Sequence, residues 1–261
     1  MAELRKKLGV SCKPQEEEEK VEVIFIIPKD NDPNWCHNPK KGYRYYKGKQ
    51  MSDEERKHRA KRVTASNAAC AAGALDYPGS SILDLIRITL GLQKKCFDQA
   101  SIVRMTRGTK MEPKVRELYE KKTGYAVTEF GMFIPDWNIR FGASPDGIVK
   151  HDDGSQHNIE IKVPGDGGVY LKLREMREAG RHNFPDLHHD HIKIEHYCQM
   201  IMTMAVTKSE FCDYIVYGYK SYDLYIERVW YNEEFWEDWL YPRLLKFLEM
   251  MDDYERELDE C

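Results

Sequence analysis

The chain has 261 residues, is 41% hydrophobic and 32% charged, and carries a formal net charge of −4 at pH 7. This composition predicts a globular chain with a sizeable core and excludes an overall basic surface, so a polyanionic partner would have to meet local basic patches. The longest apolar run, Val21–Ile27, is too short to span a bilayer, and the charged amino-terminus does not resemble a secretion signal.

The amino-terminal part is expected to form an acidic tail, a strand over Val21–Ile27 and a loop over Lys40–Lys49. In that loop Tyr43, Tyr45 and Tyr46 alternate with cations. Aromatic rings among cations suit stacking on bases and contacts with phosphate. Tyrosines that pack against the core explain the same pattern equally well, so both interpretations stay open.

The next segment begins with a capping pattern, Ser52-x-x-Glu55. It predicts a helix that carries Lys57, Arg59, Lys61 and Arg62. A second helix over Asn67–Ala74 is expected to follow, with Thr64 and Ser66 as N-caps. Cations beside a helix N-terminus suit a phosphate, because free N–H groups and the helix dipole both favour an anion. An ordinary amphipathic helix is an equal alternative.

The remaining elements follow from hydrophobic periodicity and turn residues. The expected helices are Met111–Gly124, with Pro113 in its first turn, His196–Val206, with Gln199 as its polar residue, and Glu233–Leu258, bent near Pro242. The expected strands are Val127–Ile134, Ile139–Ala143, Phe211–Tyr219 and Asp223–Tyr231. We interpret the aromatic stripe of the last helix as core packing. Helices around a central run of strands predict an α/β or α+β fold with a mixed sheet.

The segment "FGASPDGIVKHDDGSQHNIEIKVP" places charged residues inside strand-like runs. Its central turn formers predict an antiparallel hairpin with arms at Gly147–Lys150 and Asn158–Val163. With the turn centred near Asp153, Asp146 lies opposite Glu160. Alternation then puts Glu160 and Lys162 on one face of the hairpin. Two carboxylates and an ammonium therefore gather at one place, which we expect at the edge of a sheet.

Asp146 and Glu160 would offer the hard oxygen donors that Mg²⁺ or Mn²⁺ prefers. Lys162 would orient a water molecule and offset charge that develops on a phosphate. Together these groups can support metal-assisted phosphodiester hydrolysis. Without a metal, two carboxylates so close would oppose each other's ionisation. The alternative is a surface hairpin in which Glu160 and Lys162 form a weak ion pair.

"SPDG…IEIKVP" resembles the core motif of the PD-(D/E)xK nuclease superfamily, and the chain is similar more narrowly to the lambda-exonuclease-like, YqaJ-type viral recombinase family. Other motifs agree in order and approximate spacing. They are "RVTAS" (Arg62–Ser66), "RGTKMEP" (Arg107–Pro113), "IRFGASPDGIV" (Ile139–Val149) and "HYCQ" (His196–Gln199). The resemblance covers roughly three quarters of the chain, from about Arg59. Lys61 departs from it, because the family has a glycine before "VTAS".

The resemblance implies a restriction-endonuclease-like core and a role for each matching residue. The metal ligands would be Asp146, Glu160, the backbone carbonyl of Ile161 and Glu112, with two ions of Mg²⁺ or Mn²⁺ in one site. Lys162 would position the attacking water, and Gln199 would contact the metal–water network or the scissile phosphate. Arg59 would hold a 5′-terminal phosphate in a pocket shared with Ser66 and Arg62. Glu112 as a capping carboxylate and Gln199 as a satisfied polar residue are the structural alternatives.

The implied activity is a deoxyribonuclease that degrades one strand of duplex DNA from its 5′ end and leaves a 3′ single strand for recombination or for viral or phage genome processing. A structure-specific endonuclease that acts on DNA or RNA is the alternative within the superfamily. A catalytically silent nucleic-acid-binding module is the alternative outside catalysis. We assign residues 1–50 to an amino-terminal extension and residues 51–261 to the nuclease domain.

Partners and location follow partly from the resemblance and partly from the composition. The resemblance implies double-stranded DNA ends as the partner, and it allows a homo-oligomer and a single-strand-annealing or recombination protein. The chain offers no membrane-binding segment. Seven cysteines without a CxxC pair favour free thiols in a reducing compartment, the cytoplasm or a host nucleus, over disulfides or a zinc finger.

Overall fold

A five-stranded mixed sheet forms the centre of the computed structural model, which describes residues 24–29, 31–48, 50, 52–75, 81–165, 173, 175, 182–183, 188–189 and 192–260. Its strand order is β12-β11-β8-β7-β4. The strands are β4 (Val127–Thr128), β7 (Gly147–Lys150), β8 (Gln156–Lys162), β11 (Phe211–Tyr217) and β12 (Leu224–Trp230). Strand β8 runs parallel to β11, and the other neighbours are antiparallel. The predicted mixed sheet is confirmed.

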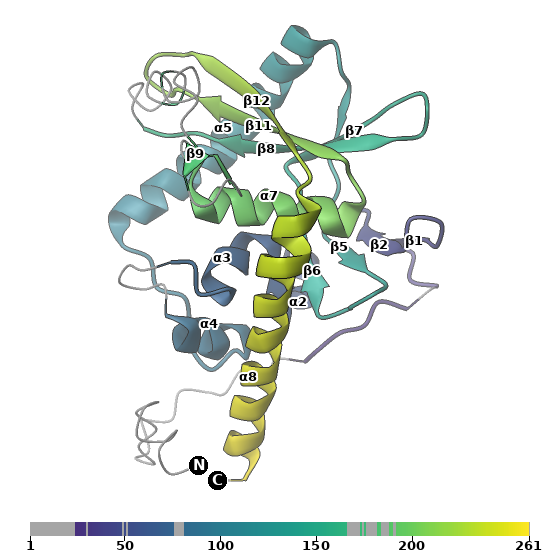
Figure 1. Ribbon diagram of the computed structural model, residues 1–261, viewed down its shortest axis with the longest axis vertical. Helices are drawn as coiled ribbons and strands as arrows, with labels where there is room; N and C mark the ends of the chain where they lie inside the picture. Colours follow the sequence, from purple (N-terminus) through teal and green to yellow (C-terminus); the bar gives the residue numbers. More distant parts are fainter. Residues whose placement is uncertain are drawn as a thin grey trace.

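Helices cover both faces of this sheet (Figure 1). On one face α5 (Gln99–Thr123) packs Val115 and Tyr119 against Ile159 and Ile161 of β8. On the other face lies α7 (Ile194–Thr207), whose apolar residues share a core cluster with Tyr214 of β11. Because strand side chains alternate, β8 buries aliphatic residues towards α5 and turns its charged residues towards α7. The predicted alternation within the hairpin is therefore confirmed.

The remaining helices and strands complete the fold. The helices are α2 (Asp53–His58), the 3₁₀ turn η1 (Ala65–Asn67), α3 (Ala68–Ala71), α4 (Ile82–Thr89), the π-helical turn η2 (Phe235–Leu240) and α8 (Tyr241–Asp259). The strands are β1 (Trp35–Asn38), β2 (Tyr43–Tyr46), β3 (Val63–Thr64), β5 (Phe133–Pro135), β6 (Phe141–Gly142), β9 (His182–Asn183) and β10 (His188–His189). Among the described residues no helix has the length and apolar character of a transmembrane span. The five cysteines in this part of the chain are free.

The amino-terminal extension contributes strands rather than a loop. Strand β2, inside the expected loop Lys40–Lys49, pairs with β1 and with β5, so these strands form one three-stranded sheet (Figure 1). Tyr43 and Tyr46 are buried, and Tyr45 packs against the main core. Tyr43 and Tyr46 therefore pack, which was one of the two open interpretations, and Tyr45 is only half-buried. The division of the chain at residue 50 stays a prediction.

Three expected elements differ from the structure. Ile24–Ile27 of the expected strand is irregular, with Ile24 and Ile27 exposed, and Val21 to Val23 lie outside the described residues. Helix α5 begins twelve residues before Met111, at Gln99, so Pro113 lies inside the helix rather than in its first turn. The expected strand Val127–Ile134 is divided between β4 and β5, which belong to different sheets.

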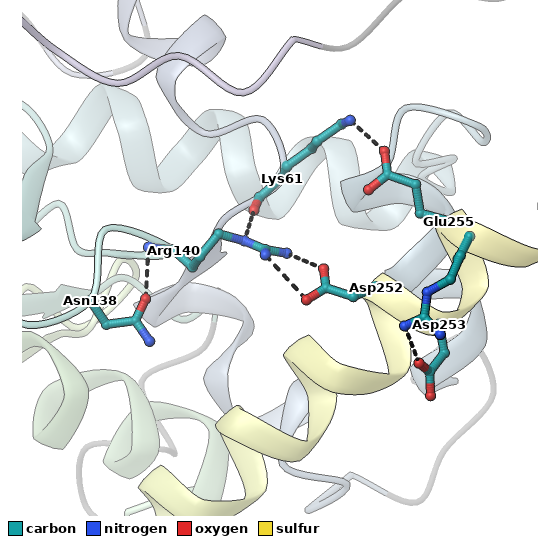
Figure 2. A network of polar contacts seen from close by, with 7 residues as sticks. Lys61, Asn138, Arg140, Asp252, Asp253 and Glu255 are labelled. Carbon is teal, nitrogen blue, oxygen red and sulfur yellow. Dashed lines mark hydrogen bonds and ion pairs between the residues drawn. The ribbon is translucent and has the colours of Figure 1, made fainter. Parts of the chain in front are cut away.

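A network of ion pairs connects the carboxyl-terminal end of α8 to the segment around β3 (Figure 2). Lys61 Nζ lies 2.5 Å from Oε1 of Glu255, and Arg140 forms two hydrogen bonds to Asp252. Arg140 Nε also donates to the carbonyl of Lys61. Helix α2 ends at His58, so Lys61 lies beyond it, with a φ of 54°. Such a left-handed backbone favours glycine, which explains why the resembling family has glycine there.

Candidate active site

The hairpin of β7 and β8 brings Asp146 next to Glu160, as the sequence predicts. Gly147 pairs with Ile159 and Ile148 with Asn158, and the same register continued by one residue places Asp146 opposite Glu160. The expected position at a sheet edge is wrong, because β8 is bonded to β7 on one side and to β11 on the other. Glu160 is 3% exposed. The carboxylates therefore lie in the middle of the sheet.

Asp146 ends the ladder between the two strands. Its Oδ2 accepts a hydrogen bond of 2.6 Å from the N–H of Ile161. In a strand, the N–H and C=O of one residue point to the same neighbour, so the carbonyl of Ile161 also points towards β7. The register places Pro145 opposite Ile161, and proline has no N–H to donate. The carbonyl oxygen of Ile161 therefore receives no ladder hydrogen bond from Pro145. This oxygen lies next to Asp146.

Lys162 and Gln199 lie on the α7 side of the hairpin. Lys162 Nζ is 2.6 Å from Oε1 of Glu160 and donates to Oε1 of Gln199 at 3.2 Å. Burial acts to lower the pKa of Lys162, but Glu160 and Asp146 outweigh it and the net shift is upward. Lys162 therefore keeps its charge at neutral pH, and it connects α7 to the carboxylate cluster.

The carboxylates are electrostatically crowded. Burial, then Glu160 and then Glu112, raise the pKa of Asp146 well above its usual range. Burial also raises the pKa of Glu112, and Glu129 and Glu160 add to this effect, while Arg116 opposes it. Glu112 reaches this region from α5, with Oε1 accepting a 3.1 Å hydrogen bond from Arg116. Three carboxylates therefore share a region in which their negative charges repel one another.

The donor set fits a divalent cation. Asp146 and Glu160 offer carboxylate oxygens and Ile161 offers a carbonyl, which are the ligand types of Mg²⁺ and Mn²⁺. A cation between the carboxylates would relieve the repulsion that raises the pKa of Asp146. Among the described residues, no three His, Cys, Asp or Glu side chains converge closely enough to hold a metal alone. The remaining ligands would be backbone, water or substrate.

Arg59 lies beside the segment that carries Asp146. Its Nη2 donates to Oγ of Ser144 at 2.9 Å and to Oε1 of Glu55 at 3.3 Å. Ser144 also donates to Glu55, which is fully buried. Nε of Arg59 is buried without a hydrogen-bond partner. Since Ser144 precedes Asp146 by two residues, a cation with an unsatisfied donor lies next to the carboxylate site.

Ser66 and Arg62 have different surroundings. Ser66 is exposed on η1, which packs against α7, and its hydroxyl lies 3.1 Å from that of Thr64. Thr64 is the N-cap residue of η1, as expected, but its side chain makes no capping hydrogen bond, and the expected N-cap Ser66 is wrong because it lies inside η1 and Asn67 precedes α3. Arg62 is 1% exposed and donates to the carbonyls of Ile26, His58 and Ile139. Burial, and then Arg140, lower its pKa to about 10. Arg62 is therefore committed to backbone carbonyls rather than available to a substrate.

Two residues of this site were missed from the sequence. Tyr214 of β11 pairs in register with Glu160, so their side chains lie on the same face. His196 of α7 makes a 2.9 Å hydrogen bond through Nδ1 to the hydroxyl of Tyr214. Burial, then Lys162 and Lys193, lower the pKa of His196 to about 2. His196 precedes Gln199 by three residues, a spacing that places both on one helix face. This spacing could have indicated that His196 belongs to the site.

A family model described as the YqaJ-like viral recombinase domain matches residues 56–210, more than half of the chain. The match contains Arg59, Glu112, the β7–β8 hairpin and Gln199, and it leaves out β1 and β2. No curated protein matches the chain in sequence.

Solved structures share the fold. An alkaline exonuclease, LHK-Exo, from Laribacter hongkongensis has a TM-score of 0.60 and 26% identity, over 80% of this chain and 97% of that chain. LHK-Exo in complex with dAMP has a TM-score of 0.62 and 25% identity, over the same shares of both chains. A phage related exonuclease from Haemophilus somnus 129PT has a TM-score of 0.52 at 10% identity, over 76% and 96%, and supports the fold alone. The expected restriction-endonuclease-like core is confirmed.

Proposed function

The chain belongs to the YqaJ-like viral recombinase family, and we propose that it is a metal-dependent exonuclease that hydrolyses the phosphodiester bonds of one strand of duplex DNA. The observation that carries this proposal is the meeting of Asp146, Glu160 and Lys162 at the end of the β7–β8 ladder. The likeness to the L. hongkongensis alkaline exonuclease over most of both chains supports the same reaction.

Asp146, Glu160 and the carbonyl of Ile161 would hold Mg²⁺ or Mn²⁺. Glu112, whose Oε1 is bonded to Arg116, would join directly or through water. A second ion would fit the excess negative charge that raises the pKa values of Asp146 and Glu112. Bound metal supplies Lewis-acid polarisation of the phosphodiester and activation of water.

Protein groups would orient the reactants around this charge. The ammonium of Lys162 would hold the attacking water in line with the phosphorus atom, because it is fixed between Glu160 and Gln199. Gln199 would complete this orientation with its free amide donors, since its Oε1 already accepts from Lys162. The buried surroundings of Glu160 would exclude bulk water and strengthen each of these interactions.

A basic and aromatic surface next to the site would contact the DNA. Arg107 on α5 donates to the carbonyl of Val163, directly after Lys162, and its guanidinium lies 5.6 Å from the ring of Tyr219. About two helical turns further on, Lys114 lies 5.8 Å from the ring of Tyr222, which is 72% exposed. Cations beside exposed rings suit phosphate and base contacts, although the whole chain is acidic.

The direction in which the strand is degraded would depend on Arg59. A 5′-terminal phosphate would accept hydrogen bonds from its guanidinium, with exposed Ser66 as a second contact. This arrangement would make degradation proceed 5′ to 3′ and leave a 3′ single strand as the substrate of a single-strand-annealing or recombination partner. A homo-oligomer would keep such an enzyme on its DNA.

The test of the proposal uses linear duplexes labelled at either end and closed circular duplexes, with Mg²⁺ or with EDTA. An exonuclease releases mononucleotides from linear DNA with Mg²⁺ and leaves closed circles intact. Cleavage of closed circles would instead establish the endonuclease alternative. Binding of DNA without cleavage in Mg²⁺ or Mn²⁺ would establish the silent module and overturn the proposal.

A further inference from the structure

A cavity of about 250 Å³ lies between the amino-terminal extension and the β7–β8 hairpin. We call it the extension pocket and define it by Lys41, Tyr45, Phe130, Lys150, His151 and Gln156. The lining residues Ile148 and Lys150 follow Asp146 by two and by four residues, and neither Asp146 nor Glu160 is among the described lining residues. The pocket therefore lies beside the carboxylate site without containing its carboxylates. Part of its wall precedes residue 56, where the family match begins.

The pocket concentrates positive charge. Lys41 and Lys150 both line it, and no Asp or Glu is among its described lining residues. Lys41 Nζ has one long hydrogen bond, 3.4 Å to the carbonyl of Gly154. Burial, and then Lys150, lower the pKa of Lys41, so the two ammonium groups interact with each other. Two cations beside a cavity repel each other unless an anion lies between them.

The same pocket offers aromatic surface and hydrogen-bonding groups. Tyr45 and Phe130 meet edge to face, with ring centroids 5.1 Å apart. Nζ of Lys150 lies 5.1 Å from the centroid of the Phe130 ring, which connects the charged and aromatic parts of the wall. Asn38 and Gln156 also line the cavity, but Oδ1 of Asn38 accepts from the N–H of Lys41, and Nε2 of Gln156 donates to the carbonyl of Thr207. The cations and rings together match a ligand that has an anionic group and a flat ring.

We propose that the extension pocket binds one nucleotide unit, with its phosphate between Lys41 and Lys150 and its base against Tyr45 and Phe130. A cavity of about 250 Å³ lies just below the usual range for ligand pockets, about 300–1,000 Å³, so it has room for no more than one nucleotide unit and excludes a duplex. The nucleotide is either a free mononucleotide or one unit of a single strand that leaves the carboxylate site. Both have the same chemistry, and the proposal holds whether or not the chain cleaves DNA.

Calorimetry on the full chain in EDTA tests this proposal with dAMP, deoxyribose 5-phosphate, inorganic phosphate and a short single-stranded oligonucleotide. The test variant is Lys41→Gln/Lys150→Gln. The control is Lys40→Gln/Lys47→Gln, which removes the same charge from exposed residues outside the pocket. Both leave Asp146 and Glu160 unchanged, so binding at the carboxylate site is the same in each protein.

We expect the test variant to lose at least tenfold in affinity for dAMP or for the oligonucleotide, and the control to change less than twofold. Loss for dAMP assigns the pocket to free mononucleotide, and loss for the oligonucleotide alone assigns it to a single strand. The base should make dAMP bind at least about fivefold more tightly than deoxyribose 5-phosphate. Equal affinity of the test and control variants for both ligands would overturn the proposal. So would binding of phosphate as tight as that of dAMP.

Discussion

The carboxylate of Asp146 accepts the backbone N–H of Ile161 at 2.6 Å, a bond that ends the β7–β8 ladder with a side-chain acceptor, while the carbonyl of Pro145 accepts from Nε2 of Gln50. This hydrogen bond fixes the orientation of the Asp146 side chain, and it uses Oδ2 but not Oδ1. It also separates two properties of Asp146, because an amide oxygen can accept the same hydrogen bond without the charge.

Asp146→Asn should stabilise the metal-free protein and abolish cleavage. The raised pKa of Asp146 means that the folded chain favours the protonated form, so folded-state stability is lost as the pH rises from about 4, the unfolded pKa. Ionisation of this carboxylate therefore opposes folding. We expect the Tm in EDTA to rise by about 2–4 °C, and the rise in Tm that Mg²⁺ gives the wild type to disappear. A lower Tm in EDTA would contradict this account.

Lys162→Met should reduce cleavage by about 10²–10⁴-fold, the usual range for loss of a group that positions or transfers a proton. The substitution also leaves Glu160 buried without its cation, so Mg²⁺ should stabilise this variant more than it stabilises the wild type. The control is Lys121→Met on the exposed surface of α5. Single-turnover cleavage and thermal unfolding measure the two effects. Unchanged cleavage by Lys162→Met would exclude its proposed role.

Arg59→Lys should narrow the difference in rate between 5′-phosphorylated and 5′-hydroxyl ends. Lysine keeps the positive charge near buried Glu55 but lacks the planar group that carries the unsatisfied Nε. We expect a loss of about tenfold on phosphorylated ends and little change on hydroxyl ends, measured with matched duplexes. Lys57→Ala, on the exposed face of α2, is the control. An equal loss on both ends would argue against a phosphate site.

The free energy of unfolding should fall with acid through His157. Tyr119 donates to Asp213, so Nε2 of His157 donates to Tyr119 and its Nδ1 accepts from His151. A second proton would have to face the N–H of His151. Burial lowers the pKa of His157 to about 4, with His151 and Arg228 adding to the effect and Asp213 opposing it.

Because the unfolded chain binds this proton near pH 6.5, stability is complete above that pH and decreases towards pH 4. We expect a decrease of up to about 1.4 kcal/mol per pH unit, measured by urea unfolding at pH 7.5, 6 and 5. His157→Gln should reduce this slope. Equal slopes for the variant and the wild type would assign the effect to other groups.

Lys61→Ala should destabilise the chain more than Lys61→Gly. Both remove the ion pair to Glu255, but glycine also relieves the left-handed backbone at this position. We expect a difference of about 1 kcal/mol, equal to about 2–4 °C in Tm. The same difference should persist in a Glu255→Gln background, since it arises from φ. Equal Tm values for the two variants would contradict this explanation.

The site could be predicted from the sequence where the signals are local. The turn residues between β7 and β8 fix the register, and alternation then puts Glu160 and Lys162 on one face. The position of β8 in the middle of the sheet could not be predicted in this way. It depends on parallel pairing with β11, which is about fifty residues distant and joined through α7. Such pairing leaves no local mark in the sequence.

Other errors have physical causes of the same kind. Arg62 was predicted to bind phosphate from its charge, but its carbonyl acceptors come from three separate segments. The start of α5 was missed because its first twelve residues are largely exposed and show no apolar stripe. Its local sign is Asp98, whose carboxylate accepts from the N–H of Ser101. In the apolar run Ile24–Ile27 the two end residues, Ile24 and Ile27, are exposed, so composition alone predicted the wrong structure there.

The central position of β8 has a consequence for how the site responds to its substrate. A strand bonded on both sides opens only when the sheet opens, so the amides of Glu160 and Lys162 should exchange their hydrogens with solvent at the rate of global unfolding. The amino-terminal half of α5, largely exposed, should exchange much faster. The carboxylates and their lysine are thus rigid before DNA arrives, and adaptation to the DNA falls to the surface around them.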